Sequence, residues 1–518
     1  GQAVQLRVNG RETTVEQVKA MLPETIKRVE WIDNPGLRYG GANAVLNFVV
    51  VNPEAGGSLM TEARPALNQA WGTYSADVKV NAGRSQLDAG ANFKLTDKIK
   101  SHRDYTETFT FADGTSVTRD EAARGGEGDH TMRDAGVTYS YVKPDTTVFI
   151  ATASLGCNFG DRAAYRGVLS LSDGSDDVML DDVQGSRGTT PGVSLYWQQN
   201  FKKRQTLVVN FNGSVLCGNT YSDYVERTDA PKPVTDIHTD IKDVNQAYAA
   251  EADYIISRDN ARFTAGASYG ANRNRSEYRN MDGAVFHQRQ DKAYFFAEYF
   301  RRMGKWTATA GIGMQYTSFR FEKSGRGNHS WNARPQATVT YSLNGNHNFR
   351  LNFTSWQSAP SLAETNVVPQ QLDGFQWRVG NQDLKTSSSY MLAFRYGFNL
   401  PRVAGSLGVR AFASPNAITP LTEWQGERLV TTYENSRGLR NLSIFLAPQV
   451  EIVPEWLMAS GYVQFRMERM RGTGYSHSNN AWSGNVAVQL AHWGFVLSGQ
   501  YVREQHDLWD EKITWGEE

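Results

Sequence analysis

The chain has 518 residues, 54 basic and 54 acidic side chains, and a mean hydropathy of -0.52. The zero net charge gives no indication of nucleic-acid binding, and no run of about 18 apolar residues is present to form a membrane-spanning helix. A soluble protein of this length would need two or more domains, yet no linker or charge block divides the sequence after residue 57.

The first fifty residues predict a small α+β unit. Residues 5–10 predict a short strand and a turn, and Thr14 is placed to cap a helix over 15–21. A second strand is expected over 26–31, and residues 44–51 form a strongly β-prone run.

From about Gly57 onward, the chain repeats strands in which apolar residues alternate with polar or small ones. The alternation is clear over 306–317, 206–215 and 457–467, and period 2 places each kind of residue on its own face. These stretches run to about ten residues or more, and the alternate face is mostly uncharged, which is typical of strands between lipid and water. The sequence therefore predicts an all-β fold, a large antiparallel transmembrane β-barrel, with side chains such as Leu351 facing lipid.

Short clusters of turn-forming residues alternate with long polar segments, as in outer-membrane barrels, which have short periplasmic turns and long extracellular loops. The short turns are expected at 83–84, 143–145, 202–204, 258–260, 302–304, 344–346, 401–403, 453–455 and 492–493. The long loops are expected at 106–129, 160–190, 218–245, 271–288, 320–332, 357–388, 416–438, 470–480 and 503–512. This spacing gives about 19 to 20 strands. Because Glu518 falls within a strand pattern, we expect a barrel cut short at both ends, with open edges.

Cys157 and Cys217 are the only cysteines, and both are in phase with the apolar face of their strands. Their strands are expected to lie two apart in the sheet, which is too far for a disulfide. We therefore expect two unpaired thiols that act as small apolar side chains.

Residues 29–48 read Val-Glu-Trp-Ile-Asp-Asn-Pro-Gly-Leu-Arg-Tyr-Gly-Gly-Ala-Asn-Ala-Val-Leu-Asn-Phe. This segment resembles the end of the plug domain of TonB-dependent outer-membrane receptors, where an Ile-Glu-Val strand precedes a Pro-x-x-x-Tyr-Gly turn and a Gly-x-x-Asn-Ile strand. Ala44 stands where that family usually has Gly. Arg38 and the long barrel make the chain more similar to the receptors of Bacteroidetes. The resemblance implies structural or gating roles for Glu30, Asn34, Pro35, Arg38, Tyr39, Gly40 and Asn47.

The resemblance implies that residues 1–56 are the rear part of a plug in the lumen and that 57–518 form most of a 22-stranded barrel, without its last strands. It also implies an importer in the outer membrane of a Gram-negative bacterium, surrounded by outer-membrane lipid and energised by the TonB–ExbB–ExbD complex. A surface lipoprotein is a further expected partner. The expected ligand is scarce, and a glycan, a peptide, haem, a siderophore and cobalamin all remain open.

Two other functions remain open from the residues alone: a passive porin, and a surface adhesin or structural barrel. A porin has no folded unit ahead of its first strand, so the first fifty residues disfavour it. Aromatic and amide side chains in the long segment near 356–385 suit stacking on a sugar ring or holding a peptide, although an aromatic girdle at the membrane interface is the favoured explanation. The candidate ligand-binding residues are Trp356, Gln370, Trp377 and Arg378.

The sequence gives no indication of catalysis. Residues 266–270 match a Gly-x-Ser-x-Gly elbow, but they lie inside an alternating strand rather than in the strand-to-helix turn that such an elbow requires. The histidines are scattered, without a ligand pair near a carboxylate. We therefore predict no catalytic residue, no metal site and no cofactor.

Overall fold

The computed structural model describes residues 4–13, 18, 21, 25–32, 44–50, 55–111, 113–229, 233–280, 284–492, 495–508 and 511–514. Nearly all regular structure within these ranges is β-strand. In the described part of the chain, no helix is long and apolar enough to cross a membrane. The helix expected over 15–21 falls mostly outside the described residues.

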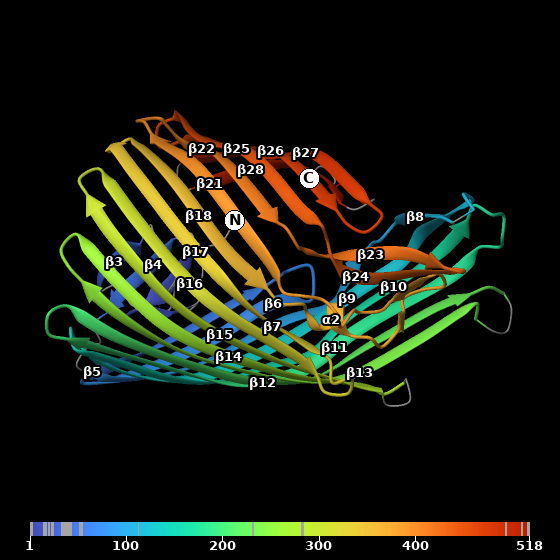
Figure 1. Cartoon of the computed structure of the whole chain (residues 1–518), viewed down its shortest axis with the longest axis horizontal. Helices are drawn as coiled ribbons and strands as arrows, with labels where there is room; N and C mark the ends of the chain where they lie inside the picture. Colours follow the sequence, from blue (N-terminus) through green and yellow to red (C-terminus); the bar gives the residue numbers. More distant parts are fainter. Residues whose placement is uncertain are drawn as a thin grey trace.

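A small sheet precedes the barrel, as the β-prone segments predicted. It consists of β1 (Gln5–Val8), β2 (Arg11–Glu12), β3 (Ile26–Ile32) and β4 (Val45–Val50), in the order β2-β1-β4-β3. Strands β1 and β4 are parallel, whereas the other neighbours are antiparallel. Figure 1 shows β3 and β4 towards one end of the barrel.

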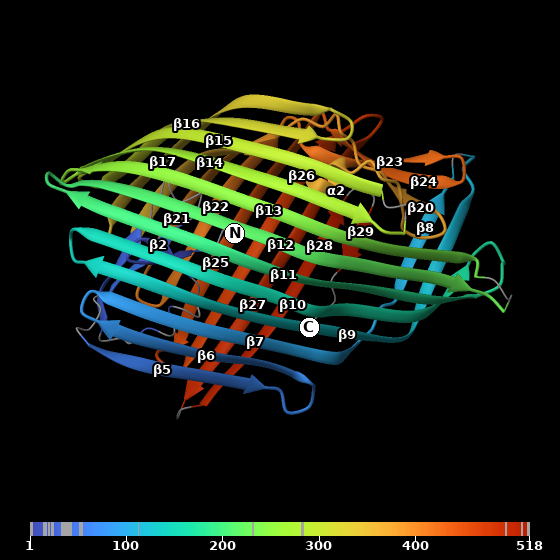
Figure 2. The same ribbon diagram turned by 90° about the horizontal axis from the view of Figure 1, so that it is seen from below.

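The long strands form one antiparallel sheet that closes into a barrel (Figures 1 and 2). In chain order they are β5 (Ala55–Pro65), β6 (Trp71–Ala82), β7 (Ser85–Ser101), β8 (Tyr105–Thr110), β9 (Ser116–Lys143), β10 (Thr147–Leu171), β11 (Val178–Phe201), β12 (Gln205–Arg227), β13 (Thr235–Ser257), β14 (Ala261–Tyr278), β15 (Ala284–Met303), β16 (Trp306–Phe321), β17 (Gly327–Asn344), β18 (His347–Ser358), β21 (Ser387–Asn399), β22 (Val403–Ser414), β25 (Gly438–Val453), β26 (Leu457–Arg471), β27 (Ser476–His492), β28 (Phe495–Leu508) and β29 (Glu511–Thr514).

The number of strands agrees with the sequence, but the open edges do not. Strand β7 pairs directly with β9, and the short β8 pairs with the far end of the same edge of β9. Without β8, twenty described strands form the wall. The predicted 19 to 20 strands are therefore confirmed, whereas the 22-strand type stays a prediction. The expected open edges are wrong, because the strand order closes on itself.

The predicted faces of the strands are confirmed by burial. On β16, Ile312 is 59% exposed on the outer face, whereas Thr317, on the opposite face, is fully buried. Leu351 on β18 is likewise exposed in phase with the outer face. An apolar outer surface is stable only against lipid, since water would make it costly.

The long loops are much shorter than the sequence predicted. Strand β9 has 28 residues and β10 has 25, so most of the segments 106–129 and 160–190 is strand. A membrane-spanning strand needs only about 9–11 residues. Beyond the bilayer the outer face meets water instead of lipid, so the apolar–polar alternation disappears while the hydrogen-bonded ladder continues.

Two long segments fold together at the other end of the barrel from the small sheet. They form α2 (Leu362–Thr365), β19 (Gln370–Gln371), β20 (Gln376–Arg378), β23 (Ile418–Gln425) and β24 (Arg428–Asn435). The four strands make a separate sheet in the order β19-β20-β24-β23. We call residues 359–386 and 415–437 the cap; β23 and β24 lie in it at the right of Figure 1.

Apolar clusters on the wall lie near the small sheet and near the cap. The cluster towards the short turns consists of Val148, Ile150, Tyr196, Val208 and Ile255. Another cluster, Phe286 with Phe319 and Phe321, packs against Leu362 of α2. These two clusters lie at the levels where the small sheet and the cap contact the wall.

The two cysteines are free, and the register explains why. Cys157 on β10 and Cys217 on β12 are both cross-strand partners of Thr189 on the intervening β11. Strands are about 4.8 Å apart, so two strands separate these backbones by nearly 10 Å, beyond the reach of a disulfide.

Candidate functional site

The small sheet contacts the inner wall at a glycine. Gly10 has a φ of +88°, and a Cβ at this position would lie 2.7 Å from the Tyr196 hydroxyl oxygen. Tyr196 is buried on β11 and donates a hydrogen bond of 2.6 Å to Gln198 Oε1. Only glycine combines this backbone angle with so close an approach. The sheet therefore touches the wall through the turn between β1 and β2.

Asn47 connects that turn to the acidic residue of the plug-like segment. Its Nδ2 donates to Glu30 Oε2 (2.8 Å), and its Oδ1 accepts from the Gly10 amide (2.8 Å). Glu30 and Asn47 are cross-strand partners on β3 and β4, and Asn47 is only 9% exposed. Arg28 Nε donates to the other oxygen of Glu30 at 2.8 Å. Both of these predicted motif residues thus belong to one network.

The remaining motif residues are not placed by the structure. Asn34, Pro35, Arg38, Tyr39 and Gly40 lie outside the described residues. Their predicted roles stay predictions.

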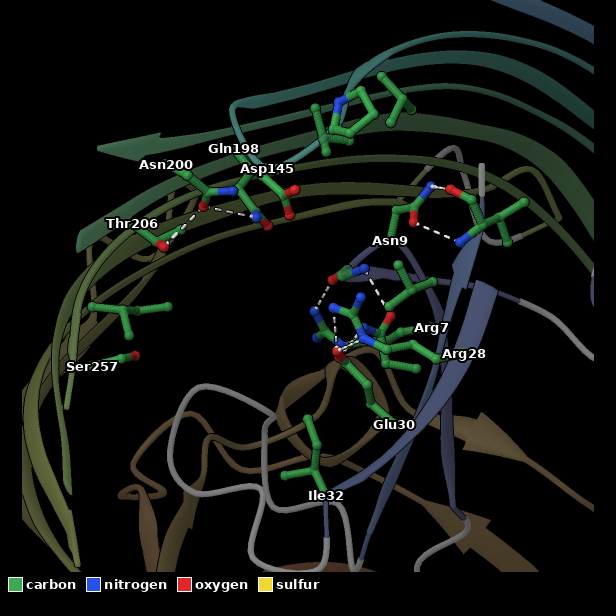
Figure 3. Close-up of a pocket in the computed structure, with 18 of the residues that line it drawn as sticks. Arg7, Asn9, Arg28, Glu30, Ile32, Asp145, Gln198, Asn200, Thr206 and Ser257 are labelled. Atoms are coloured by element: carbon green, nitrogen blue, oxygen red, sulfur yellow. Dashed lines mark hydrogen bonds and ion pairs between the residues drawn. The ribbon is translucent and has the colours of Figure 1, made fainter. Parts of the chain in front are cut away.

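A cavity of about 510 Å³ separates the small sheet from the wall near the short turns (Figure 3). The sheet contributes Arg7, Arg28 and Glu30, and the wall contributes Gln198 and Asn200. Gln198 Nε2 donates to Asn200 Oδ1 at 3.2 Å. Much of this boundary is therefore polar and open to water, and a polar, hydrated boundary separates at lower cost than a close-packed apolar one.

On one side of the barrel mouth, the cap stacks on the segment around β8. The rings of Phe375 and Phe109 have centroids 5.1 Å apart, and those of Trp424 and Phe111 are 4.5 Å apart. Trp424 Nε1 also donates to the carbonyl oxygen of Thr110 at 2.7 Å. Aromatic pairs of this kind contribute about 0.5–1.5 kcal/mol each beyond area burial.

A buried ion-pair network lies beneath these rings. Arg119 of β9 is 6% exposed and contacts Asp373 of the cap (2.7 Å), Glu226 of β12 (3.4 Å) and Glu107 of β8. Burial lowers the pKa of Arg119, but the neighbouring carboxylates of Asp373 and Glu107 outweigh it and the net shift is upward. A single guanidinium therefore joins two barrel strands, the short β8 and the cap.

The cap is also bound to the opposite strands. The Tyr278 hydroxyl, at the end of β14, accepts hydrogen bonds from Gln370 Nε2 (2.8 Å) and from Asn366. Gln288 Nε2 of β15 donates to the Thr365 hydroxyl at 3.3 Å. Since β8–β9 and β14–β15 are separated along the wall, the cap crosses the mouth of the barrel.

The structure brings together three of the four predicted ligand-binding residues. Arg378 donates to Gln370 Oε1 at 2.6 Å across β19 and β20, and the Arg428 guanidinium lies 4.6 Å from the Trp377 ring centre. Trp356 instead lies on wall strand β18, where its ring is 5.7 Å from that of Phe412. It is in phase with the inner face, so the alternative of a lipid-facing girdle does not apply to it.

Sequence reasoning missed Arg119, Asp373 and Glu226. Asp373 follows Arg119 by 254 residues and Glu226 follows it by 107, so no local sequence pattern joins them. The only signal was the presence of charged residues in segments that were expected to be solvated loops.

Comparisons with known proteins identify the fold. The model of the outer membrane protein beta-barrel family matches residues 199–508, and no curated protein sequence matches the chain. The copper transporter OprC superposes with a TM-score of 0.65 over 90% of this chain and 70% of its own, at 10% identity. An FrpB iron transporter of Neisseria meningitidis gives 0.55 over 97% and 80%, at 11% identity. Pyoverdine-bound FpvA of Pseudomonas aeruginosa gives 0.58 over 99% and 72%, at 10% identity. The matched proteins are barrels, transporters and receptors rather than enzymes.

Proposed function

Because the chain belongs to the outer membrane protein beta-barrel family and lies in the outer membrane of a Gram-negative bacterium, we propose that it is a TonB-dependent receptor that imports a scarce ligand. The observation that carries this proposal is the network of Glu30, Asn47 and Gly10, which lies in a separate sheet against the inner wall. A sheet that faces the wall across a polar cavity is suited to displacement during transport.

The two ends of the lumen support an importer over a passive porin. The small sheet lies at the level of the short turns, and the cap crosses the mouth on the side of the long loops. A passive pore needs neither element. An adhesin or structural barrel has no use for a polar, water-accessible boundary inside the lumen.

We assign a separate role to each of two consecutive parts of the chain. Residues 1–56 act as the rear part of a plug, and 57–518 act as the barrel, in a receptor of the Bacteroidetes type. Force from the TonB–ExbB–ExbD complex moves the plug, and a surface lipoprotein delivers or retains the ligand. Outer-membrane lipid surrounds the wall.

The proposed ligand contacts are in and below the cap. Trp377 and Arg378 lie on β20, Gln370 lies beside them on β19, and Trp356 lies on the inner wall. Rings, amides and a guanidinium suit a glycan, a peptide, haem, a siderophore or cobalamin. Two superposed structures are named as transporters of copper and iron, and a third is bound to pyoverdine. Metal chelates should therefore be the first ligands tested.

The first experiment measures closure of the lumen. Single-channel conductance in planar bilayers should be low for the intact chain and should rise when residues 1–50 are deleted. Replacing 361–385 by a short Gly-Ser linker removes most of the cap's first segment and serves as the matched control, because it opens the mouth but leaves the sheet in place. Unchanged conductance after removal of residues 1–50 would contradict the proposal.

The second experiment tests energy coupling. Cells that produce the protein, with or without TonB, are offered labelled haem, cobalamin, ferric siderophore, oligosaccharide and peptide. We expect accumulation of one class only, and only with TonB. Accumulation that is independent of TonB would favour a passive pore.

A further inference from the structure

Three arginines lie side by side on the outer face of the barrel. Arg273 on β14 is the direct cross-strand partner of Arg289 on β15, which is in turn the partner of Arg320 on β16. Direct partners share a face, so the three guanidinium groups project from one surface. We call them the arginine row.

The arginine row carries more positive charge than its neighbours compensate. Asp291 lies 2.9 Å from Arg273 and 3.6 Å from Arg289. Arg320 is exposed, and no carboxylate among the described residues lies within 4.0 Å of it. Like charges on directly opposite residues destabilise a sheet. An anion bound to the row would remove that repulsion.

Aromatic side chains lie on the same face, on the membrane side of the arginine row. Tyr269 and Tyr316 precede Arg273 and Arg320 by four residues on β14 and β16, and Trp331 is the cross-strand partner of Tyr316. Tyr269 and Trp331 are exposed, at 51% and 58%. Four residues of strand span about 13 Å. Aromatic side chains at this level mark the boundary between acyl chains and head groups.

The same arrangement recurs further around the wall, on β25 and β26. Arg440 on β25 and Arg469 on β26 are exposed cross-strand partners, and Arg469 follows the outward Phe465 by four residues. Phe465 stacks on Trp482, with ring centroids 4.7 Å apart. A basic pair just beyond an aromatic pair, at two places on the circumference, matches a lipid layer rather than a single soluble partner.

We propose that the arginine row binds the phosphorylated head group of an anionic glycolipid in the outer leaflet, with the acyl chains against Tyr269, Tyr316 and Trp331. Guanidinium groups bind phosphate oxygens through paired, charge-assisted hydrogen bonds. The long-loop end, where the row lies, faces the outer leaflet in barrels of this class. This site is independent of the transported ligand and of TonB.

The test uses the intact chain in detergent micelles and bisphosphorylated lipid A as the probe. The triple variant R273Q/R289Q/R320Q should bind it on the order of 100-fold more weakly, since each basic side chain near an anionic head group contributes about one factor of five. The control K202Q/K203Q/R402Q removes the same charge from exposed residues at the short-turn end and should bind normally. Equal binding by both variants would overturn the proposal.

Two further arms identify the source of the phosphate. Dephosphorylated lipid A should bind the intact chain as weakly as bisphosphorylated lipid A binds the triple variant. Inorganic phosphate should neither raise the melting temperature nor compete; if it does both as well as the lipid, the site is a phosphate site and the lipid assignment is wrong. The single variant R320Q, which breaks no ion pair within 4.0 Å, should still lose several-fold in affinity if the triple variant fails to fold.

Discussion

Asp373 of the cap and Arg119 of the barrel wall form a buried ion pair of 2.7 Å between residues 254 positions apart in the chain. Glu226 and Glu107 share the same guanidinium. The pair connects the cap to the barrel wall, and its removal should therefore act on the cap before it acts on the barrel.

Replacing Arg119 by Gln should loosen the cap. It leaves buried carboxylates without a counter-charge, which costs about 3–5 kcal/mol where one partner of a buried ion pair is lost. Hydrogen exchange of the β20 amides should accelerate, whereas exchange in β16 should not change. The control is Asp383→Asn, because the Arg326–Asp383 pair is exposed (3.4 Å) and contributes under about 1 kcal/mol. Equal protection of β20 in both variants would mean that Arg119 does not hold the cap.

Replacing Gly10 by Ala should displace the small sheet. The new Cβ would lie 2.7 Å from the Tyr196 hydroxyl and would disturb the bond of that hydroxyl to Gln198. Gly114 is a matched control, since its φ of +85° is nearly that of Gly10 and nothing lies within 4 Å of its Cβ position. Both variants carry backbone strain of about 1 kcal/mol. Only the Gly10 variant should raise channel conductance in planar bilayers.

Arginine substitutions at two adjacent wall positions should have opposite outcomes. Leu195 on β11 is exposed on the lipid face, and Asn212 on β12, beside it, lines a cavity on the lumenal face. Leu195→Arg should destabilise the barrel by about 2–4 kcal/mol if it lies near the bilayer midplane, whereas Asn212→Arg should cost much less. Denaturant unfolding from lipid vesicles measures both. A larger loss for Asn212→Arg would reverse the assigned faces.

Oxidation should not crosslink the two thiols. Cys157 and Cys217 flank Thr189 on the outer face, nearly 10 Å apart by strand spacing. Copper phenanthroline should leave the monomer's gel mobility unchanged, and a membrane-soluble maleimide should label both residues. The variant Thr189→Cys adds a third thiol directly opposite both Cys157 and Cys217, and it should permit a crosslink.

The wall could be predicted from the sequence because lipid imposes a local rule. Each strand must be apolar on alternate positions, and each turn needs residues such as those at 202–204, so both signals lie within a few residues. The rule ends where β9 and β10 leave the bilayer. There, polar residues occupy both faces, and a strand cannot be told from a loop by its pattern.

The cap could not be predicted for a different reason. Strand β20 pairs in parallel with β24, which comes from a separate segment of the chain. The Tyr278 hydroxyl accepts a hydrogen bond from Gln370, which lies 92 residues later in the sequence. No periodicity encodes such contacts. Glu30 and Asn47 were found because a short signature carries both, yet only the structure shows that one hydrogen bond joins them.

The height of the wall places the cap away from the bilayer. At 28 residues, β9 exceeds a bilayer crossing of about 9–11 residues by enough to rise on the order of 50 Å along the strand beyond the hydrocarbon. Arg119 lies near the far end of that extension. The ion-pair network that holds the cap therefore lies beyond the hydrocarbon layer, and its loss should leave the lipid-facing surface undisturbed. Changes in bilayer thickness or fluidity should accordingly alter the insertion of this protein and leave the contact between Arg119 and Asp373 unchanged.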